Sequence, residues 1–177
     1  MRGRECTPGR QQGLSLFEIA VITVVVGLLM VIAMDRMLRL TVDIERVNVQ
    51  RVTGQLQSAL SMEFAQRVVD GRRDSLARLN GMNPMTLALK PPRDYEGELT
   101  SAQARNVEPG HWYFNRETGT LVYRVRYRRH FQSPTPAVAR YRTELVFRDV
   151  NGDGAFHVPP DRPEGVRLKA LGEYRWN

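Results

Sequence analysis

Residues 13–34 read GLSLFEIAVITVVVGLLMVIAM, and this stretch decides the architecture. From Leu14 to Met34 the run holds 21 residues with a single charged side chain, Glu18. An α-helix of that length rises about 32 Å, which matches the roughly 30 Å hydrocarbon core of a bilayer. The stretch therefore predicts a membrane-spanning helix over residues 14–34.

The polar segment before the run, residues 1–13, is basic and carries Cys6, the only cysteine of the chain. A secretory signal peptide would have a shorter apolar region followed by small residues at a cleavage site. Here the run is long and ends at Met34-Asp35, so cleavage after it is disfavoured. With one cysteine, no intramolecular disulfide can form.

Glu18 interrupts the apolar run, and a carboxylate inside hydrocarbon is costly unless something compensates it. One interpretation places Glu18 near the lipid headgroups, where its carboxylate reaches water. The other interpretation supplies a cation at the same depth. Cleavage after Gly13 would create one, because the new α-amine of Leu14 is positively charged and a neighbouring subunit can present it.

The sequence Gly13-Leu14-Ser15-Leu16-Phe17-Glu18, followed by the apolar helix, resembles the class III signal of type IV prepilins and type II secretion pseudopilins. The resemblance implies that a dedicated prepilin peptidase cuts after Gly13 and methylates Leu14, and that Glu18 guides subunit docking. Leu14 stands where major pilins usually carry phenylalanine, and Asp35 where many have a helix-kinking proline. Both departures favour a minor pilin or pseudopilin.

The same resemblance implies a cellular setting. Residues 1–13 would be a cleaved leader, and the chain would be a single-pass inner-membrane protein with its C-terminal domain in the periplasm, later part of an extracytoplasmic filament. Its partners would be the prepilin peptidase, other pilin or pseudopilin subunits, the inner membrane assembly platform and membrane lipid. The numbers of Lys and Arg flanking the apolar run are equal, so charge alone does not set this orientation.

The helix is expected to continue through residues 35–70 as an amphipathic segment, since no proline occurs between Leu14 and Gly71. Apolar residues recur there at helical steps of three or four; these are Val42, Ile44, Val47, Val52, Leu56, Leu60, Phe64 and Val68. Asp70-Gly71 predicts the end of the helix. Residues 71–110 are expected to form a connecting αβ region with a short helix near residues 73–79 and otherwise loop.

Residues 111–177 change to a period of two, which predicts strands. A hairpin is expected around Glu117-Thr118-Gly119-Thr120, a further strand around residues 140–148 and a last one over residues 166–174. The predicted fold is α+β: a long N-terminal helix whose outer half packs on an antiparallel sheet of about four strands, as in pilins.

The loop after residue 148 has the oxygen ligands of the first half of an EF-type calcium loop. The candidate ligands are Asp149, Asn151, Asp153, the Ala155 carbonyl and Asp161. Proline occupies position 160, where that loop would carry its bidentate glutamate. Asn-Gly and Asp-Gly also favour hairpin turns, so a turn alone and a calcium site both stay open.

Six arginines alternate with apolar residues on one predicted sheet face: Arg124, Arg126, Arg128, Arg129, Arg140 and Arg142. They are either a solvated face or a surface that captures DNA or another polyanion. The tyrosines that would stack on bases are expected on the opposite face.

No catalytic constellation is recognisable, so the chain is expected not to be an enzyme. The second alternative, beside a minor pilin that captures a polyanion, is a simple membrane-tethered extracytoplasmic domain.

Overall fold

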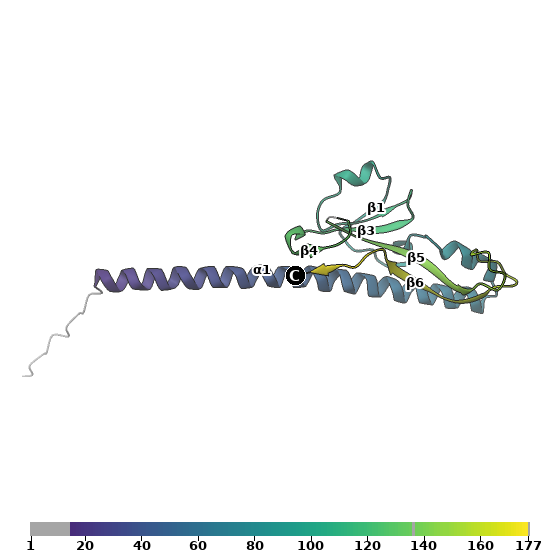
Figure 1. Ribbon diagram of the computed structural model, residues 1–177, viewed down its shortest axis with the longest axis horizontal. Helices are drawn as coiled ribbons and strands as arrows, with labels where there is room; N and C mark the ends of the chain where they lie inside the picture. Colours follow the sequence, from purple (N-terminus) through teal and green to yellow (C-terminus); the bar gives the residue numbers. More distant parts are fainter. Residues whose placement is uncertain (1–14, 136, 177) are drawn as a thin grey trace, which may run out of the picture. The chain divides into compact units, whose positions relative to one another are not determined.

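The computed structural model describes residues 15–135 and 137–176. The chain divides into two compact units, Met1–Thr41 and Val42–Asn177. Residues 13 and 14, the predicted cleavage junction, lie outside the described residues. Figure 1 gives the order of the elements along the chain.

The first element is α1, Leu16–Val69, a single helix of 54 residues. Ser15 caps it, because the Phe17 N–H donates to the Ser15 hydroxyl oxygen at 3.3 Å. At the other end Gly71 has a φ of 72°. The Gly71 N–H donates to the Val68 carbonyl and the Arg72 N–H to the Arg67 carbonyl, which is the hydrogen-bond pattern of a Schellman C-cap. The predicted helix end is confirmed.

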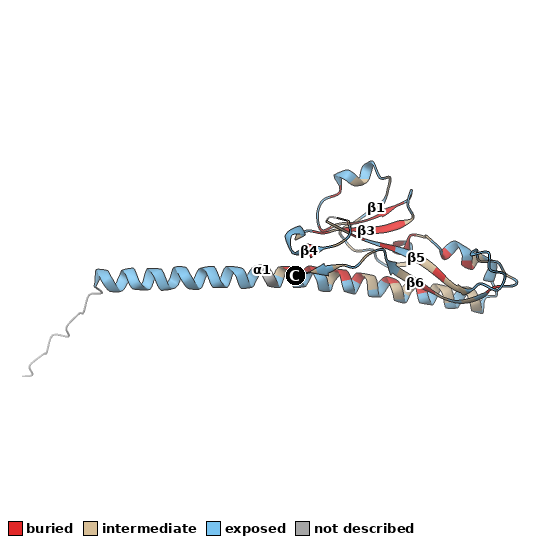
Figure 2. Cartoon of the chain, in the orientation of Figure 1, coloured by how far each residue is buried: buried red, intermediate tan, exposed pale blue. Residues whose placement is uncertain are grey.

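In the first unit, α1 is exposed at every residue from 16 to 37 (Figure 2). Within the described chain, α1 is the one helix long and apolar enough to cross a membrane. In hydrocarbon the Thr23 hydroxyl would be satisfied, since it donates to the Ile19 carbonyl at 2.8 Å.

In the second unit, α1 buries a stripe made of Val42, Glu45, Val49, Val52, Leu56 and Leu60. The predicted stripe was wrong at Ile44 and Val47, which are 66% and 60% exposed. The reason is that the buried positions are 42, 45, 49 and 52, so Glu45 lies on the stripe where the pattern predicted an apolar residue.

The main sheet has five strands in the order β1-β2-β3-β5-β6. Their bounds are β1 Tyr95–Leu99, β2 Trp112–Asn115, β3 Thr120–Arg124, β5 Val138–Arg148 and β6 Arg162–Ala170. β1 pairs parallel with β2, and the other pairs are antiparallel. A two-stranded sheet joins β4, Phe131–Gln132, to β7, Arg175–Trp176.

Four short 3₁₀ helices complete the second unit: η1 Arg73–Leu79, η2 Pro84–Leu87, η3 Gln103–Asn106 and η4 Arg128–His130. The predicted helix near residues 73–79 is η1. The α+β fold is confirmed, with five strands in the main sheet where about four were expected.

Two strands differ from their predictions. β1 lies inside the predicted connecting region. It pairs in parallel with β2, which is distant in the sequence, and its side chains Glu96 and Glu98 are exposed. β6 begins at Arg162 and ends at Ala170, earlier than the predicted 166–174. Pro163 lies in it opposite Phe147, at the irregular point of the β5–β6 pairing, where a residue without an N–H is tolerated.

One sheet face packs on the second half of α1 (Figure 1). Val49, Val52 and Leu56 from the helix join the aromatic residues of β2, β3 and β5 in one core. Trp112 is fully buried at its centre, with ring centroids 4.8 Å from Tyr123 and 6.0 Å from Tyr141. Each such side chain contributes about 2 kcal/mol by leaving water.

The opposite sheet face is partly covered too. Tyr113, Val122 and Val107 form a separate small cluster there, with Leu99, Ala104 and Val138 packed against it. Cross-strand pairing aligns Tyr113 with Val122 and Val122 with Arg140, so Tyr113 shares a face with the arginines. The expectation that the tyrosines lie opposite the arginines holds for Tyr123 and Tyr141 and is wrong for Tyr113.

Candidate functional site

The predicted assembly residue Glu18 lies in the first turn of α1 and is exposed. A carboxylate there is favoured by the positive end of the helix dipole. Its neighbours Leu16 and Phe17 are 87% and 77% exposed. Over residues 15–135 and 137–176 no cation lies within ion-pair distance of Glu18. In an apolar environment, its counter-charge would have to come from outside that range.

A second glutamate on α1, Glu45, is buried at 7% exposure and was missed by the sequence analysis. Its carboxylate accepts hydrogen bonds from the Tyr123 hydroxyl at 2.8 Å, the Arg126 N–H at 2.7 Å and the Tyr127 N–H at 3.2 Å. Burial together with the charge of Glu45 raises the pKa of the Tyr123 phenol well above its usual range. The proton therefore stays on Tyr123, and the Glu45 carboxylate accepts a hydrogen bond from the phenol.

Glu45 also explains where β3 ends. β3 ends at Arg124, and beyond it the Arg126 and Tyr127 N–H groups donate to the Glu45 carboxylate instead of to a neighbouring strand. The signal for Glu45 was present in the sequence, as a carboxylate three residues after Val42 and four before Val49 on a buried stripe.

Gln57 is a second residue that links α1 to the sheet. Its side-chain amide donates to the Val166 carbonyl at 3.0 Å and accepts from the Leu168 N–H at 2.7 Å. β6 is the edge strand of the main sheet, so this amide occupies backbone groups that another strand would otherwise pair.

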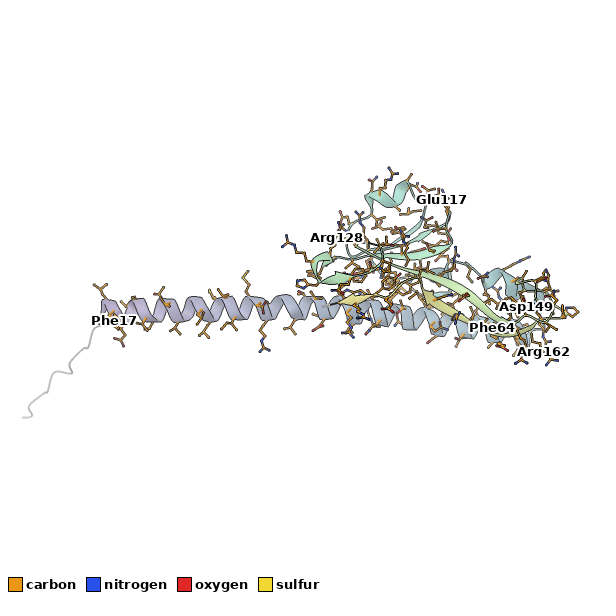
Figure 3. The ribbon with its side chains drawn as sticks, in the orientation of Figure 1. Phe17, Phe64, Glu117, Arg128, Asp149 and Arg162 are labelled. Atoms are coloured by element: carbon orange, nitrogen blue, oxygen red, sulfur yellow. The ribbon has the colours of Figure 1, made fainter. Side chains whose placement is uncertain are left out.

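The candidate calcium residues lie in the loop between β5 and β6 (Figure 3). Asp149 accepts from the Gly152 and Gly154 N–H groups, at 2.6 and 2.8 Å. Asp153 accepts from the Ala155 N–H at 2.8 Å and from the Asn151 amide at 2.9 Å. The loop therefore brings Asp149, Asn151 and Asp153 together around its own backbone.

Asp161 closes the base of this loop. It is 4% exposed and accepts from the Val150 N–H at 2.9 Å and the His157 N–H at 2.8 Å. These two hydrogen bonds hold the pKa of Asp161 below its usual range. In the described part of the chain, no group of three or more His, Cys, Asp or Glu residues is arranged to hold a metal ion. Calcium binding here stays a prediction.

The six arginines of the predicted polyanion face are engaged differently. Arg124 is half-buried and donates to the carbonyls of Arg105 and Val107. Arg142 donates to the Thr118 carbonyl, and the Arg126 guanidinium lies against Gly110. Arg128, Arg129 and Arg140 are exposed. Half of the set is thus held by local contacts, which reduces the part of the face able to contact a polyanion.

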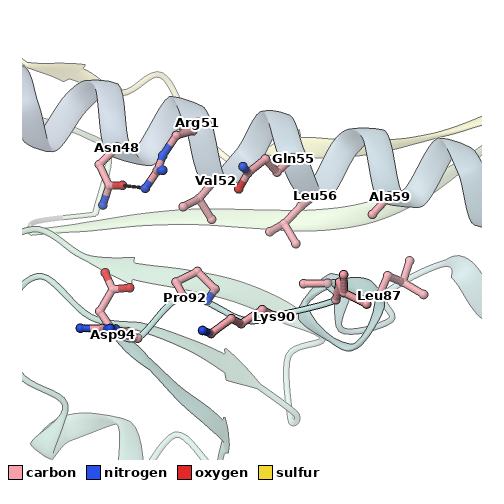
Figure 4. Close-up of a pocket in the computed structure, with 13 residues that line it drawn as sticks. Asn48, Arg51, Val52, Gln55, Leu56, Ala59, Leu87, Lys90, Pro92 and Asp94 are labelled. Atoms are coloured by element: carbon pink, nitrogen blue, oxygen red, sulfur yellow. Dashed lines mark hydrogen bonds between the residues drawn. The ribbon is translucent and has the colours of Figure 1, made fainter.

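A groove of about 740 Å³ lies in the second unit between α1 and residues 87–94. Figure 4 shows its apolar lining, which includes Val52 and Leu56, and the hydrogen bond from Arg51 to Asn48 at 2.9 Å on its helix side. Leu89, on the loop side, is fully exposed.

No family model, curated protein or solved structure matches the chain.

Proposed function

We propose that this chain is a structural subunit, a minor pilin or pseudopilin, of a type IV pilus or type II secretion filament. One observation carries the proposal: an exposed apolar helix begins beside a glycine junction and bears one carboxylate in its first turn. A carboxylate on an apolar helical surface requires a counter-charge, and an assembling subunit can receive it from a neighbour.

In the proposed pathway, the apolar part of α1 first holds the subunit in the inner membrane. The prepilin peptidase removes residues 1–13 and methylates the new amine at Leu14. The Leu14 amine of one subunit then pairs with Glu18 of the next on the assembly platform, and the exposed apolar face of residues 16–37 moves from lipid into contact with other helices. The role is structural and not enzymatic.

The α+β domain supports this role by its construction. α1 is continuous to Val69 and ends on a capped turn, and its second half is fixed to the sheet by Glu45, Gln57 and an apolar core. A subunit that transmits force along a filament needs a domain firmly attached to its helix.

Intact-mass spectrometry of membrane-extracted protein, produced with an active prepilin peptidase, tests the proposal. We expect a chain that begins at Leu14, carries one added methyl group and lacks Cys6, so that thiol reagents no longer label it. Gly13→Val should block this cleavage, whereas Gly9→Val, the matched change within the leader, should leave it intact.

A mass that retains residues 1–13 beside an active peptidase would contradict processing and favour a membrane-tethered extracytoplasmic domain. Cleavage of Gly13→Val at the normal rate would show that another protease is responsible, and would contradict the proposal equally.

A further inference from the structure

A pocket of about 280 Å³ lies on the sheet face opposite α1. Its floor is formed by Tyr113 of β2 and Val138 of β5. Three arginines from different elements line it: Arg105 of η3, Arg124 at the end of β3 and Arg128 of η4. These residues define the arginine pocket.

The residues that line the arginine pocket give it a positive charge. No carboxylate lines it, and within residues 15–135 and 137–176 none of its three guanidinium groups forms an ion pair. Burial raises the pKa of the Tyr113 phenol, and the charges of Arg140 and Arg124 act against that rise. The positive potential thus extends to Arg140 and reaches the phenol at the pocket floor.

The pocket is also partly preorganised. One Arg124 nitrogen is fixed by the carbonyls of Arg105 and Val107, so the guanidinium is held in place while its other N–H groups remain available. Ser101, at the wall, accepts a hydrogen bond from the Asn115 amide at 3.0 Å, and its backbone N–H donates to the Glu117 carboxylate at 3.1 Å. Arginine forks fit the oxygens of phosphate and carboxylate groups.

We propose that the arginine pocket binds one phosphate group, either as free phosphate or as the ester of a small molecule. Three elements contribute guanidinium groups to the lining, which suits the several oxygens of a tetrahedral dianion better than the two of a carboxylate. A volume of about 280 Å³ suits a single phosphate rather than a run of nucleotides. The inference does not depend on the proposed filament function.

Isothermal titration calorimetry on the full-length chain in neutral detergent tests this site, with inorganic phosphate as the probe at constant ionic strength. Titration should extend to about ten times a millimolar dissociation constant. We expect saturable binding of one phosphate per chain. Arg105→Gln and Arg128→Gln should each weaken binding at least about fivefold, since each removes a charged donor.

Two further variants separate a built pocket from general positive charge. Arg162→Gln makes the same charge change on β6, away from Arg128 (Figure 3), and should alter affinity less than about twofold. Tyr113→Phe keeps the buried ring and removes only the hydroxyl, and should weaken binding about threefold or more. Far-UV circular dichroism checks that each variant is folded.

Glycerol 3-phosphate in place of inorganic phosphate distinguishes the two sources. Equal or tighter binding assigns a phosphate ester, and clearly weaker binding assigns free phosphate. The proposal is overturned if phosphate does not saturate, if Arg162→Gln weakens binding as much as Arg128→Gln, or if acetate displaces phosphate at equal concentration.

Discussion

Two of the three glutamates of α1, Glu18 and Glu45, are in opposite environments. Glu45 is buried and accepts three hydrogen bonds from its own chain. Glu18 stands in an apolar segment and has no cation within ion-pair distance in residues 15–135 and 137–176. A carboxylate that leaves water needs donors or a counter-charge. Glu45 is thus satisfied by its own chain, whereas within residues 15–135 and 137–176 nothing neutralises Glu18.

That contrast separates two kinds of effect. Changes at Glu45 should alter stability, because its partners are internal. Changes at Glu18 should leave stability unchanged and alter association, because the partner we propose is the Leu14 amine of another subunit. The same distinction applies to the two parts of α1, one packed on the sheet and the other exposed.

Glu45→Ala is expected to have the largest effect on stability. It leaves the Tyr123 hydroxyl and the Arg126 and Tyr127 N–H groups without an acceptor, so we expect a loss of about 3 kcal/mol. For a chain of this size that lowers the Tm by roughly 6–12 °C. Thermal unfolding in detergent, followed by circular dichroism, measures it.

Glu63→Ala is the matched control on the same helix. Glu63 forms an ion pair with Arg67 at 2.7 Å, one helical turn away, and its loss should cost about 0.5 kcal/mol. Equal Tm values for the two variants would mean that the buried carboxylate does not secure α1 to β3.

Gln57→Ala should have an intermediate effect. It removes both hydrogen bonds to β6, which corresponds to about 1.5 kcal/mol, and it uncovers the Val166 carbonyl and the Leu168 N–H at the sheet edge. We therefore also expect more self-association, measured by light scattering during the melt.

Gln55→Ala provides the comparison for that variant. Gln55 is exposed on the same helix, and alanine is a good helix former, so its change should stay within about 0.5 kcal/mol. If Gln55→Ala and Gln57→Ala behave alike, the edge contact contributes nothing.

The smallest effect concerns pH and Asp161. Its folded pKa is depressed by the Val150 and His157 N–H groups, so the stability it contributes is present above its unfolded pKa and is lost as the pH falls through the folded value. Asp161→Asn should therefore lower the Tm near pH 6, and the difference from the parent should shrink as the pH falls below the ordinary aspartate pKa.

Asp43→Asn, an exposed carboxylate change on α1, supplies the reference melts for that comparison. A Tm difference between parent and Asp161→Asn that stays constant from pH 6 to pH 3 would contradict the assigned cause.

The separate calcium prediction is tested by melts with chelator and with millimolar calcium. A calcium-induced increase in the Tm of the parent that is absent from both Asp149→Ala and Asp153→Ala would support a calcium site.

The helix and the hairpin could be predicted from the sequence because both depend on local patterns: an apolar run without proline, and alternation around a turn. The hairpin turn is fixed locally by Asn115, whose side-chain oxygen accepts from the Glu117 and Thr118 N–H groups. β1 could not be predicted in the same way, since the strand it pairs with, β2, follows only after a connection of more than ten residues.

The candidate sites also differ in whether a local sequence pattern or the fold reveals them. Glu18 was found because a charge in an apolar run is conspicuous, whereas Glu45 was missed because a charge in an amphipathic helix is ordinary. Its role depends on Tyr123, 78 positions away. The arginine pocket likewise required the fold, because η3, β3 and η4 bring Arg105, Arg124 and Arg128 together.

The central claim is that the partner of Glu18 belongs to another subunit, and filament incorporation of Glu18→Val tests it most directly. The measurement is the fraction of subunit recovered in sheared filaments relative to the membrane pool, with Asp43→Val as the control. Glu18→Val removes a charge from the apolar segment, so it should insert and fold normally. We expect its incorporation to fall at least about tenfold, because the neighbouring amine loses its buried counter-charge, while Asp43→Val incorporates near the parent level. Incorporation of Glu18→Val at the parent level would contradict the account.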